Sequence, residues 1–367
     1  MISQERPGQP HASPLKRLGW QASLQRKAAV PVSICTMTTT SLFPGFRSQT
    51  VNVAAGIDIH AIVGGSGPPL LLLHGHPQTH AIWHRVAPTL AQHFTLVAVD
   101  LRGYGDSSKP AGEADHANYS KRAMALDALT VMRTLGFDRF SVLAHDRGAR
   151  VAHRLAADHP QAVLRMALLD IAPTLAMYAQ TSEEFARAYW HWFFLIQPAL
   201  LPERLIEADP AAYAVDVMGR RSGGLSVFDP RALAEYQRCL ALPGTAHGIC
   251  EDYRAAAGID LAHDRADREQ GARLALPLLV LWGEQGVVHR CFAPLKEWKL
   301  VADDVQGEAL PCGHYIAEEA PEALLARVLP FLLGSRSRRS SRTFAASVTG
   351  SPSTVTRSAD SVRPVDV

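Results

Sequence analysis

The sequence predicts an α/β fold in which a mainly parallel sheet is covered by helices and interrupted by a helical cap. Short apolar runs typical of strands alternate with longer patterns that have apolar residues at helical spacing. The stretch from Thr174 to about Arg273 has no strand-like run and is rich in Ala, Leu, Glu and Arg. It is therefore expected to form several helices inserted between two strands of the sheet.

The first elements are expected to be a hairpin over Val51–Val63 and a glycine-rich turn over Gly64–Pro69. No GK[ST] follows these glycines and they precede a strand, so a turn is favoured over a phosphate-binding loop. The later strands are expected at Leu70–Leu73, Thr95–Val99, Phe140–Ala144, Met166–Asp170, Leu276–Trp282 and Val305–Leu310. The helices outside the cap are expected at His80–Gln92, Tyr119–Leu135, Arg147–Asp158 and Pro321–Leu333.

These elements divide the chain into a core of residues 43–173 and 274–333 and a cap of residues 174–273. Ligands of such sheets bind beyond the carboxyl ends of the strands, so a cap inserted there is expected to contribute substrate-facing side chains. Residues 1–42 are expected to form a disordered arm, with a weak targeting segment or sequence upstream of a start at Met37 as alternatives. Residues 334–367 are expected to form a disordered basic tail, because Ser, Thr and Arg cannot bury enough surface to fold.

Composition narrows the function classes. Residues 1–36 and residues 334–367 each carry a net charge of +4, which leaves −6 on residues 37–333 and argues against a nucleic-acid partner. No apolar run approaches the roughly 20 residues that span a bilayer, so no membrane segment is expected. Five cysteines without CxxC spacing argue against a disulfide framework and favour the cytoplasm. A monomer and a homodimer are both left open.

Asp146 is the residue that points to a chemistry. It follows the apolar run Phe140–Ala144 and opens a helical pattern with a glycine two residues later, the arrangement of a nucleophile held on a strand-to-helix turn. A carboxylate there can attack a saturated carbon and form an alkyl ester that water must then cleave. The alternative is an ordinary helix-capping aspartate.

Cleavage of such an ester needs a base, an acid that orients it, and oxyanion donors. His314, directly after the last expected strand, is the expected base; Asp170 is its expected partner, with Glu284 in reserve. The N–H groups of His76 and Arg147 are the expected oxyanion donors. The histidines at 74, 76, 80 and 84 also suggest zinc, but no Glu lies between His80 and His84, so no metal is expected.

Arg147 and Arg150 lie in the first turn of the expected helix, where positive charge opposes the helix dipole. A local violation of this kind often marks function. Three residues apart, the two guanidinium groups can face one substrate carboxylate. Ordinary ion pairing is the alternative for Arg150.

These motifs resemble one family. From about Phe43 to Leu333 the chain is similar to the haloacetate (fluoroacetate) dehalogenases of the α/β-hydrolase fold, most specifically in HDRGAR from residue 145 and in YWHW from residue 189. The motifs HGHP and RGYGDS are shared with a wider group that includes epoxide hydrolases. The chain departs from the family at three places: Ala144 replaces a glycine, His76 stands where Phe is commoner, and Met218–Gly223 differs from the family's aromatic-bearing cap segment.

The resemblance implies a hydrolase that converts a 2-haloacetate and water to glycolate and halide without a cofactor. Asp146 would be the nucleophile, His314 the base, Asp170 its partner, and Arg147 with Arg150 the carboxylate clamp. His191, Trp192 and Tyr253 would bind the halide, although from residues alone the aromatic run Tyr189–Trp192 is more typical of a packed helix face. An epoxide hydrolase with the same nucleophile and a non-catalytic receptor for small acids are the alternatives.

Overall fold

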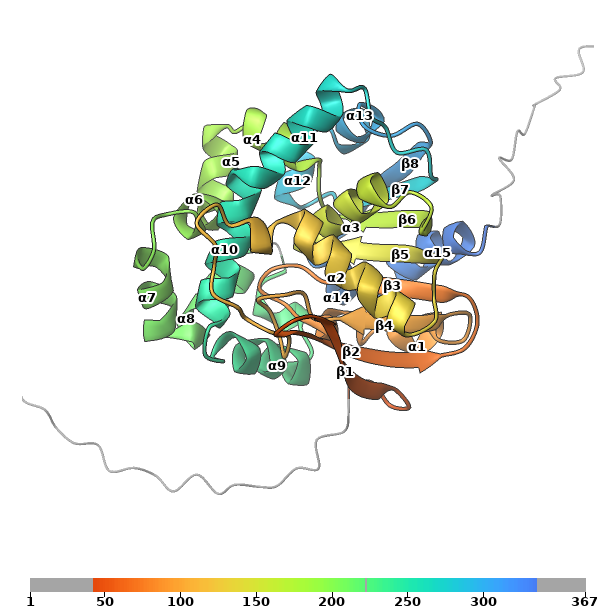
Figure 1. Cartoon of the computed structure of the whole chain (residues 1–367), viewed down its shortest axis with the longest axis horizontal. Coiled ribbons are helices and arrows are strands. Elements are labelled where there is room, and N and C mark those ends of the chain that lie inside the picture. The colour runs from red at the N-terminus through yellow and green to blue at the C-terminus, as the bar shows by residue number, and fades with distance from the viewer. Residues whose placement is uncertain (1–41, 222, 335–367) are drawn as a thin grey trace, which may run out of the picture. The chain divides into compact units, whose positions relative to one another are not determined.

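The computed structural model describes residues 42–334 except residue 222, and shows a central eight-stranded sheet within them (Figure 1). The strand order is β1-β2-β4-β3-β5-β6-β7-β8. β2 pairs antiparallel with β1 and β4, and the other neighbours pair parallel. The strands are β1 (Arg47–Ala54), β2 (Ile57–Gly65), β3 (Pro69–Leu73), β4 (Thr95–Val99), β5 (Phe140–His145), β6 (Val163–Leu169), β7 (Leu278–Gly283) and β8 (Val305–Leu310).

Helices connect most of these strands, and the longest connection separates β6 from β7. Outside that connection lie α1 (Ala87–Leu90), α2 (Lys121–Thr134), α3 (Asp146–Asp158), α12 (Val287–Cys291), α13 (Pro294–Lys299), α14 (Ile316–Glu319) and α15 (Pro321–Leu332), with short 3₁₀ turns η1 (His80–Trp83) and η2 (Ala117–Tyr119). Within it lie α4 (Thr174–Ala179), α5 (Glu183–Ala188), α6 (Trp190–Leu195), α7 (Leu201–Ala208), α8 (Pro210–Gly219), η3 (Leu225–Val227), α9 (Pro230–Leu240), α10 (Thr245–Ala257) and α11 (Ile259–Glu269). Figure 1 shows α5 to α9 gathered on the left of the sheet.

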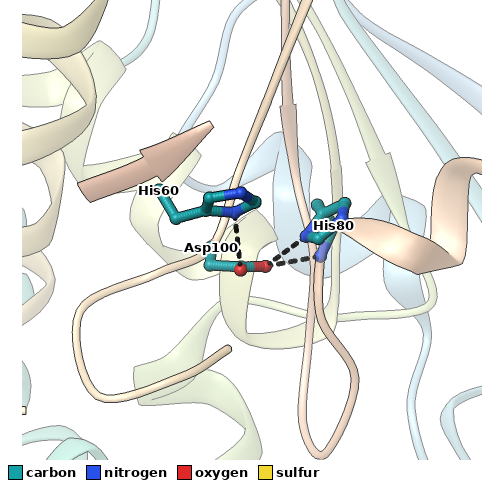
Figure 2. Close-up of side chains that lie close together, drawn as sticks. All are labelled: His60, His80 and Asp100. Carbon is teal, nitrogen blue, oxygen red and sulfur yellow. Dashed lines mark hydrogen bonds and ion pairs between the residues drawn. The ribbon is translucent and has the colours of Figure 1, made fainter. Parts of the chain in front are cut away.

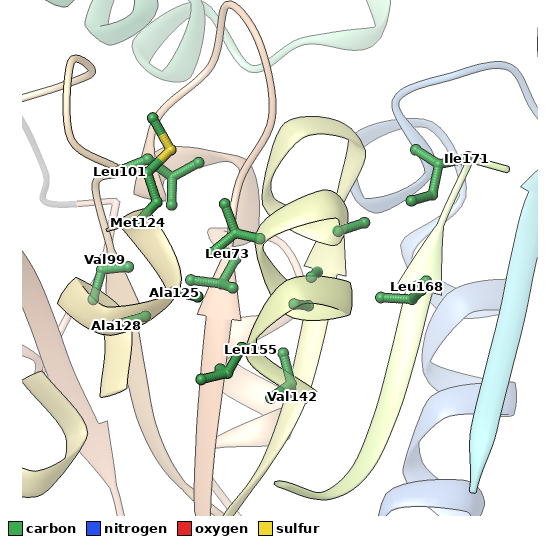
Figure 3. Packing of buried hydrophobic residues seen from close by; sticks show 14 of the residues in the cluster. Leu73, Val99, Leu101, Met124, Ala125, Ala128, Val142, Leu155, Leu168 and Ile171 are labelled. Carbon is green, nitrogen blue, oxygen red and sulfur yellow. The ribbon is translucent and has the colours of Figure 1, made fainter. Parts of the chain in front are cut away.

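The central strands are buried along nearly their whole length, and successive side chains of each strand point to opposite faces of the sheet. Along β3, Leu71 and Leu73 belong to one hydrophobic cluster, whereas Leu70 and Leu72 belong to another. Figure 3 shows the first cluster, in which residues of α2 and α3 lie over β3, β4, β5 and β6. The second cluster contains residues of α1, α14 and α15. This rigid double-sided core fixes the ends of the strands on which the polar side chains described below are carried.

Two of the elements expected from the sequence have different bounds in the structure. The helix expected over His80–Gln92 is split into η1 and α1, because Pro88 has no N–H to donate and fits only in the first turn of a helix. The strand expected over Met166–Asp170 runs from Val163 to Leu169, and Asp170 leaves it with a left-handed φ of 51°. Short helices α12, α13 and α14, which periodicity did not indicate, complete the connections near β7 and β8.

The predicted division into core and cap stays a prediction, although α4 to α11 do occupy the connection between β6 and β7. The predicted arm and tail fall, apart from Leu42 and Gly334, outside the described residues. Among the helices that are described, none combines the length and the apolar character that crossing a membrane requires.

Candidate active site

The turn between β5 and α3 holds Asp146 in a backbone conformation that few residues adopt. Its φ is 44°, in the left-handed region that is costly for any residue with a Cβ atom. Two glycines make room for the turn: a Cβ on Gly148 would lie 2.4 Å from the His74 carbonyl oxygen, and a Cβ on Gly75 would lie 2.5 Å from the Asp146 Cβ. Strain of this kind persists only where the surroundings enforce it, and it directs the Asp146 carboxylate toward the loop after β3.

That carboxylate is buried but ionised. The His76 backbone N–H donates to Asp146 Oδ2 at 3.2 Å, and the Arg147 N–H lies in the first turn of α3, where no helical acceptor exists. Burial by itself would raise the pKa of Asp146, but the charged guanidinium groups of Arg150 and Arg147, together with the neighbouring His314 and His145, hold it below its usual value. The two expected oxyanion donors therefore lie beside the expected nucleophile.

His314 and Asp170 form a buried pair next to this turn. His314 Nδ1 and Asp170 Oδ2 are 2.5 Å apart, and the Gly283 N–H donates to Asp170 Oδ1 at 3.0 Å. Glu284, the reserve candidate for this partner, is exposed to solvent. Burial, followed by the nearby positive charge of Arg221, lowers the pKa of His314 well below that of an ordinary histidine, so the imidazole is neutral. Its Nε2 has no partner among the described residues and is free to receive a proton from water.

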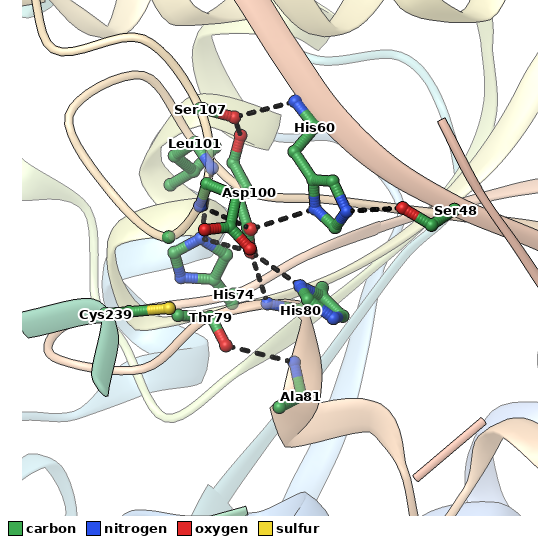
Figure 4. Close-up of polar contacts among 12 residues, drawn as sticks. Ser48, His60, His74, Thr79, His80, Ala81, Asp100, Leu101, Ser107 and Cys239 are labelled. Carbon is green, nitrogen blue, oxygen red and sulfur yellow. Dashed lines mark hydrogen bonds and ion pairs between the residues drawn. The ribbon is translucent and has the colours of Figure 1, made fainter. Parts of the chain in front are cut away.

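Asp100 fixes the loop that carries the His76 N–H (Figures 2 and 4). Its Oδ1 accepts from the N–H and the Nδ1–H of His80, at 2.8 Å and 2.9 Å, and its Oδ2 lies 3.0 Å from His60 Nδ1. Although burial opposes both charges, the pKa of His80 is raised and that of Asp100 is held well below its usual range, so they form an ion pair. His74 Nε2 accepts from the Leu101 N–H at 3.0 Å. These histidines therefore hold the loop in place through hydrogen bonds, whereas the sequence suggested zinc as an alternative for two of them.

Arg147 is held by a carboxylate that sequence analysis did not single out. Its Nε and Nη2 donate to Asp252 Oδ2 and Oδ1 at 2.8 Å and 2.9 Å. Asp252 also pairs with Lys121 and accepts from the Tyr104 hydroxyl at 2.6 Å. Only Arg147 Nη1 has no partner among the described residues. The two arginines expected to bind a substrate carboxylate are therefore not equivalent. Asp252 accepts from most of the Arg147 guanidinium group, and only its Nη1 remains available to a ligand.

Replacing Asp252 by asparagine is expected to destabilise the fold. Two buried cations, Arg147 and Lys121, would lose their shared counter-ion, and breaking a buried ion pair costs about 3–5 kcal/mol. At about 2–4 °C per kcal/mol for a chain of this size, the Tm should fall by about 10 °C in a thermal melt. The control is Glu183→Gln, which breaks the exposed pair with Arg187 and should leave the Tm within about 2 °C. Equal melting of Asp252→Asn and the parent would contradict this role.

Arg150 is buried beside the nucleophile without a carboxylate. Its Nη1 donates to Thr174 Oγ1 at 3.0 Å and to the Ala172 carbonyl at 3.3 Å, and its Nε has no partner among the described residues. Within those same residues no carboxylate oxygen lies within 4.0 Å of it. Ion pairing, the alternative role for Arg150, is therefore not what the structure shows. Its charge is left to be balanced by Asp146 or by a bound anion.

The three residues expected to bind halide come together from two cap helices. The guanidinium carbon of Arg147 lies 4.0 Å from the ring centroid of Tyr253 on α10, and that of Arg150 lies 4.7 Å from the ring of Trp192 on α6. The Tyr253 hydroxyl and Trp192 Nε1 are buried without a partner in the described part of the chain. Burial raises the pKa of Tyr253 well above its usual value, so it remains an O–H donor. His191 is buried too, but its Nε2 faces Arg221 Nη2 at 3.4 Å.

Comparison with known proteins places this arrangement in a family. A family profile described as the alpha/beta hydrolase fold matches residues 68–288. The chain belongs to the alpha/beta hydrolase fold family. It is 46% identical to the fluoroacetate dehalogenase of Burkholderia sp. over 81% of this chain and 97% of that protein. It is 34% identical to the soluble epoxide hydrolase of Corynebacterium sp. strain C12 over 75% of this chain and 94% of that protein.

A solved structure agrees with this assignment. The crystal structure of ALR0039 from Nostoc sp. PCC 7120, named for the alpha/beta hydrolase fold, superposes with a TM-score of 0.75 at 53% identity and covers 78% of this chain and 98% of that one. The predicted fold class and the predicted resemblance to haloacetate dehalogenases are confirmed, and the protein is an enzyme of the hydrolase class.

Three residues of this hydrolase site were not predicted from sequence. His145 lies with its ring centroid 4.6 Å from that of His314, and its Nε2–H donates to the His314 carbonyl at 2.9 Å. Asp252 holds Arg147, and Arg221 reaches Tyr189 and His191 from the segment after α8. The only signal in the sequence was indirect: Asp252 adjoins Tyr253, and Arg221 lies in the cap segment that departs from the family.

Proposed function

We propose that the protein hydrolyses the carbon–halogen bond of a 2-haloacetate to give glycolate and halide through an ester on Asp146. An Asp146 oxygen displaces the halide from carbon, and the halide departs toward Trp192 and Tyr253. His314 Nε2 then takes a proton from water, whose oxygen attacks the Asp146 carboxyl carbon. The N–H groups of His76 and Arg147 stabilise the resulting oxyanion. Collapse releases glycolate, whose alkoxide oxygen takes the proton from His314. The second proton of the water leaves to solvent as Asp146 returns to a carboxylate that contains the water oxygen.

The observation that carries this proposal is Arg150, a buried guanidinium without a carboxylate in the described structure. A buried cation is costly unless it is paired, and a substrate carboxylate would supply both the charge and acceptors for the free Nε–H. Arg147 Nη1 is the second donor available to the same anion. The 46% identity to a fluoroacetate dehalogenase supports the same substrate class.

The donors opposite the nucleophile support the departure of a halide. Trp192 Nε1–H and the Tyr253 O–H have no acceptor among the described residues, and unsatisfied buried donors are costly unless a ligand accepts from them. The Tyr178 hydroxyl is a third such donor, with its ring centroid 5.0 Å from that of Trp192. Burial raises the pKa of Tyr178 to about 12, so it also remains protonated.

An epoxide hydrolase is the second candidate, because such enzymes share this nucleophile and the epoxide hydrolase of Corynebacterium is 34% identical. The free Tyr253 hydroxyl could protonate an alkoxide as the ring opens. A neutral epoxide, however, leaves the charge of Arg150 unused.

A substrate panel separates the candidates. Fluoroacetate, chloroacetate, 1-chlorobutane, styrene oxide and a nitrophenyl ester are offered to the purified protein, and halide, diol and phenol are measured. Halide from the haloacetates alone supports the proposal. Diol from styrene oxide without halide from either haloacetate would replace it with the epoxide hydrolase, and no product from any of them would favour the non-catalytic receptor.

The ionisation of Asp146 predicts how the first step depends on pH. The guanidinium groups of Arg150 and Arg147, which lower the pKa of Asp146, remain in a His314→Asn variant, so we expect its nucleophile to stay charged well below neutral pH. The rate constant of the halide burst should therefore be the same at about pH 5 and at about pH 8 in rapid-quench measurements. A decline below about pH 6 would mean that the carboxyl is protonated there and would contradict the electrostatic account.

No cofactor takes part in the proposed reaction. We also propose that the enzyme acts in the cytoplasm, which agrees with the free state of Cys239, Cys250, Cys291 and Cys312. Light scattering would decide between the monomer and the homodimer.

A further inference from the structure

Arg221 is a buried cation to which a bound haloacetate supplies no anionic partner in the proposed reaction. It follows α8, in the cap segment where the sequence departs from the family. Its Nη1 donates to the Tyr189 hydroxyl at 3.1 Å, its Nη2 lies 3.4 Å from His191 Nε2, and its guanidinium carbon lies 4.7 Å from the Tyr189 ring centroid. Within the described structure, no carboxylate oxygen lies within 4.0 Å of it.

The side chain of Arg221 lines a pocket of about 330 Å³ that reaches His314. His191 and His314 form part of its inner wall. Three further arginines line its outer part, and each is paired with an exposed acid: Arg187 with Glu183, Arg220 with Asp216, and Arg290 with Glu184. These three ion pairs are neutral overall, so Arg221 adds one net positive charge to the lining of the pocket.

We propose that this pocket binds a second anionic group of the substrate, so that the enzyme acts on 2-halo dicarboxylates in addition to haloacetates. This rests on the proposed function, in which Arg150 holds the first carboxylate. The substrate chain would pass from Arg150 over Asp146 and His314 to Arg221, with the second carboxylate accepting from Arg221 in the outer pocket. A monocarboxylate leaves Arg221 without a counter-ion, whereas a dicarboxylate supplies one. Arg221 is thus a specificity-determining residue.

Arg221 could instead act only as a positioning residue for the base. Its partner Tyr189 has its hydroxyl 3.4 Å from His314 Nδ1, so loss of the arginine could shift the imidazole. That role affects every substrate equally, because it acts on the water-activating step that all of them share. The second-anion role affects only substrates with two carboxylates, and it also appears in binding without reaction.

The first experiment measures binding of unreactive acids by titration calorimetry. Succinate and glutarate are compared with propionate and butyrate on the parent, on Arg221→Gln and on Arg220→Gln, a matched control in which the lost arginine is exposed and paired with Asp216. A charge-assisted contact is expected to make the better dicarboxylate bind about 10- to 100-fold more tightly than the monocarboxylates. Arg221→Gln should abolish this preference, and Arg220→Gln should retain it. Equal affinities for both classes in the parent would overturn the proposal.

The second experiment measures halide release from chloroacetate and from 2-chlorosuccinate. Arg221→Gln should lower the ratio of kcat/KM for chlorosuccinate to kcat/KM for chloroacetate by about 10- to 100-fold. An equal loss on both substrates, with a shifted pH profile, would make Arg221 a positioning residue and overturn the proposal. Arg221→Lys, which keeps the charge, should retain part of the preference even if Arg221→Gln folds poorly in a thermal melt.

The two proposals fail in distinguishable ways. Halide from chloroacetate without any preference for dicarboxylates in binding or turnover would refute the second-anion pocket and leave the proposed function intact. A dicarboxylate preference that requires Arg221, without halide from either substrate, would refute the dehalogenase and leave the pocket intact.

Discussion

Replacing His314 by asparagine is expected to stop turnover after a single halide per active site. Formation of the ester needs only the ionised Asp146 carboxylate, whereas its hydrolysis needs a base to take a proton from water. The neutral His314, whose Nε2 has no partner in the described structure, is placed to do so. A general base contributes about 10²- to 10⁴-fold, so steady-state turnover should fall about 10³-fold. Quenched samples should show a burst of halide, and mass spectrometry of the digested protein should show a carboxymethyl group on the Asp146 peptide.

Two controls make this result specific. Asp146→Asn should show neither burst nor adduct, because an amide cannot displace the halide. His93→Asn removes an exposed histidine and should turn over at the parental rate. Parental turnover by His314→Asn would remove His314 from the mechanism. In the parent, a single turnover in heavy-oxygen water should leave the isotope in Asp146, and glycolate that carries all of it would mean direct attack by water.

Replacing Arg150 by leucine is expected to remove most activity on chloroacetate. The guanidinium has no carboxylate within 4.0 Å in the described residues, and each charge-assisted hydrogen bond to a substrate carboxylate contributes about 1.5–3 kcal/mol. Loss of two such bonds corresponds to about 10²- to 10⁴-fold in kcat/KM. Arg150→Lys should recover only part of this, because an ammonium group keeps the charge but not the planar fork.

The matched substrate for this test is chloroacetamide, which has the size of chloroacetate without its charge. The ratio of kcat/KM for chloroacetate to that for chloroacetamide should fall steeply in Arg150→Leu and remain unchanged in Arg133→Leu, which removes an exposed arginine from α2. A thermal melt shows whether loss of the contacts to Thr174 and Ala172 has unfolded the variant. Undiminished activity on chloroacetate in a folded Arg150→Leu variant would refute the proposed role of Arg150 in binding the substrate carboxylate.

Local patterns in the sequence predicted much of the fold and part of the site. Apolar runs and turn residues indicated the strands because strands of a sheet buried on both faces are nearly continuous in hydrophobic residues. The position of Asp146 between a strand and a helix, and of His314 after the last strand, needed only the order of elements along the chain. Asp170 was also predicted at the end of its strand, and its oxygen lies 2.5 Å from His314 Nδ1.

Contacts between distant segments could not be predicted in this way. Pairing of Arg147 with Asp252 joins residues 105 positions apart, and the contact between His145 and the His314 carbonyl spans 169. Nothing within a few residues of Asp252 indicates that its carboxylate faces an arginine at the start of α3.

The sequence by itself determined the order of strands and helices along the chain, the strand-to-helix turn at Asp146 and the histidine that follows the last strand. Each of these depends on neighbouring residues. Only the tertiary structure decided how the charges are shared: Asp252 neutralises Arg147, whereas Arg150 and Arg221 have no carboxylate within 4.0 Å in the described part of the chain. The physical reason is that burial makes an unpaired charge costly, and both burial and pairing are set by which distant segments pack together.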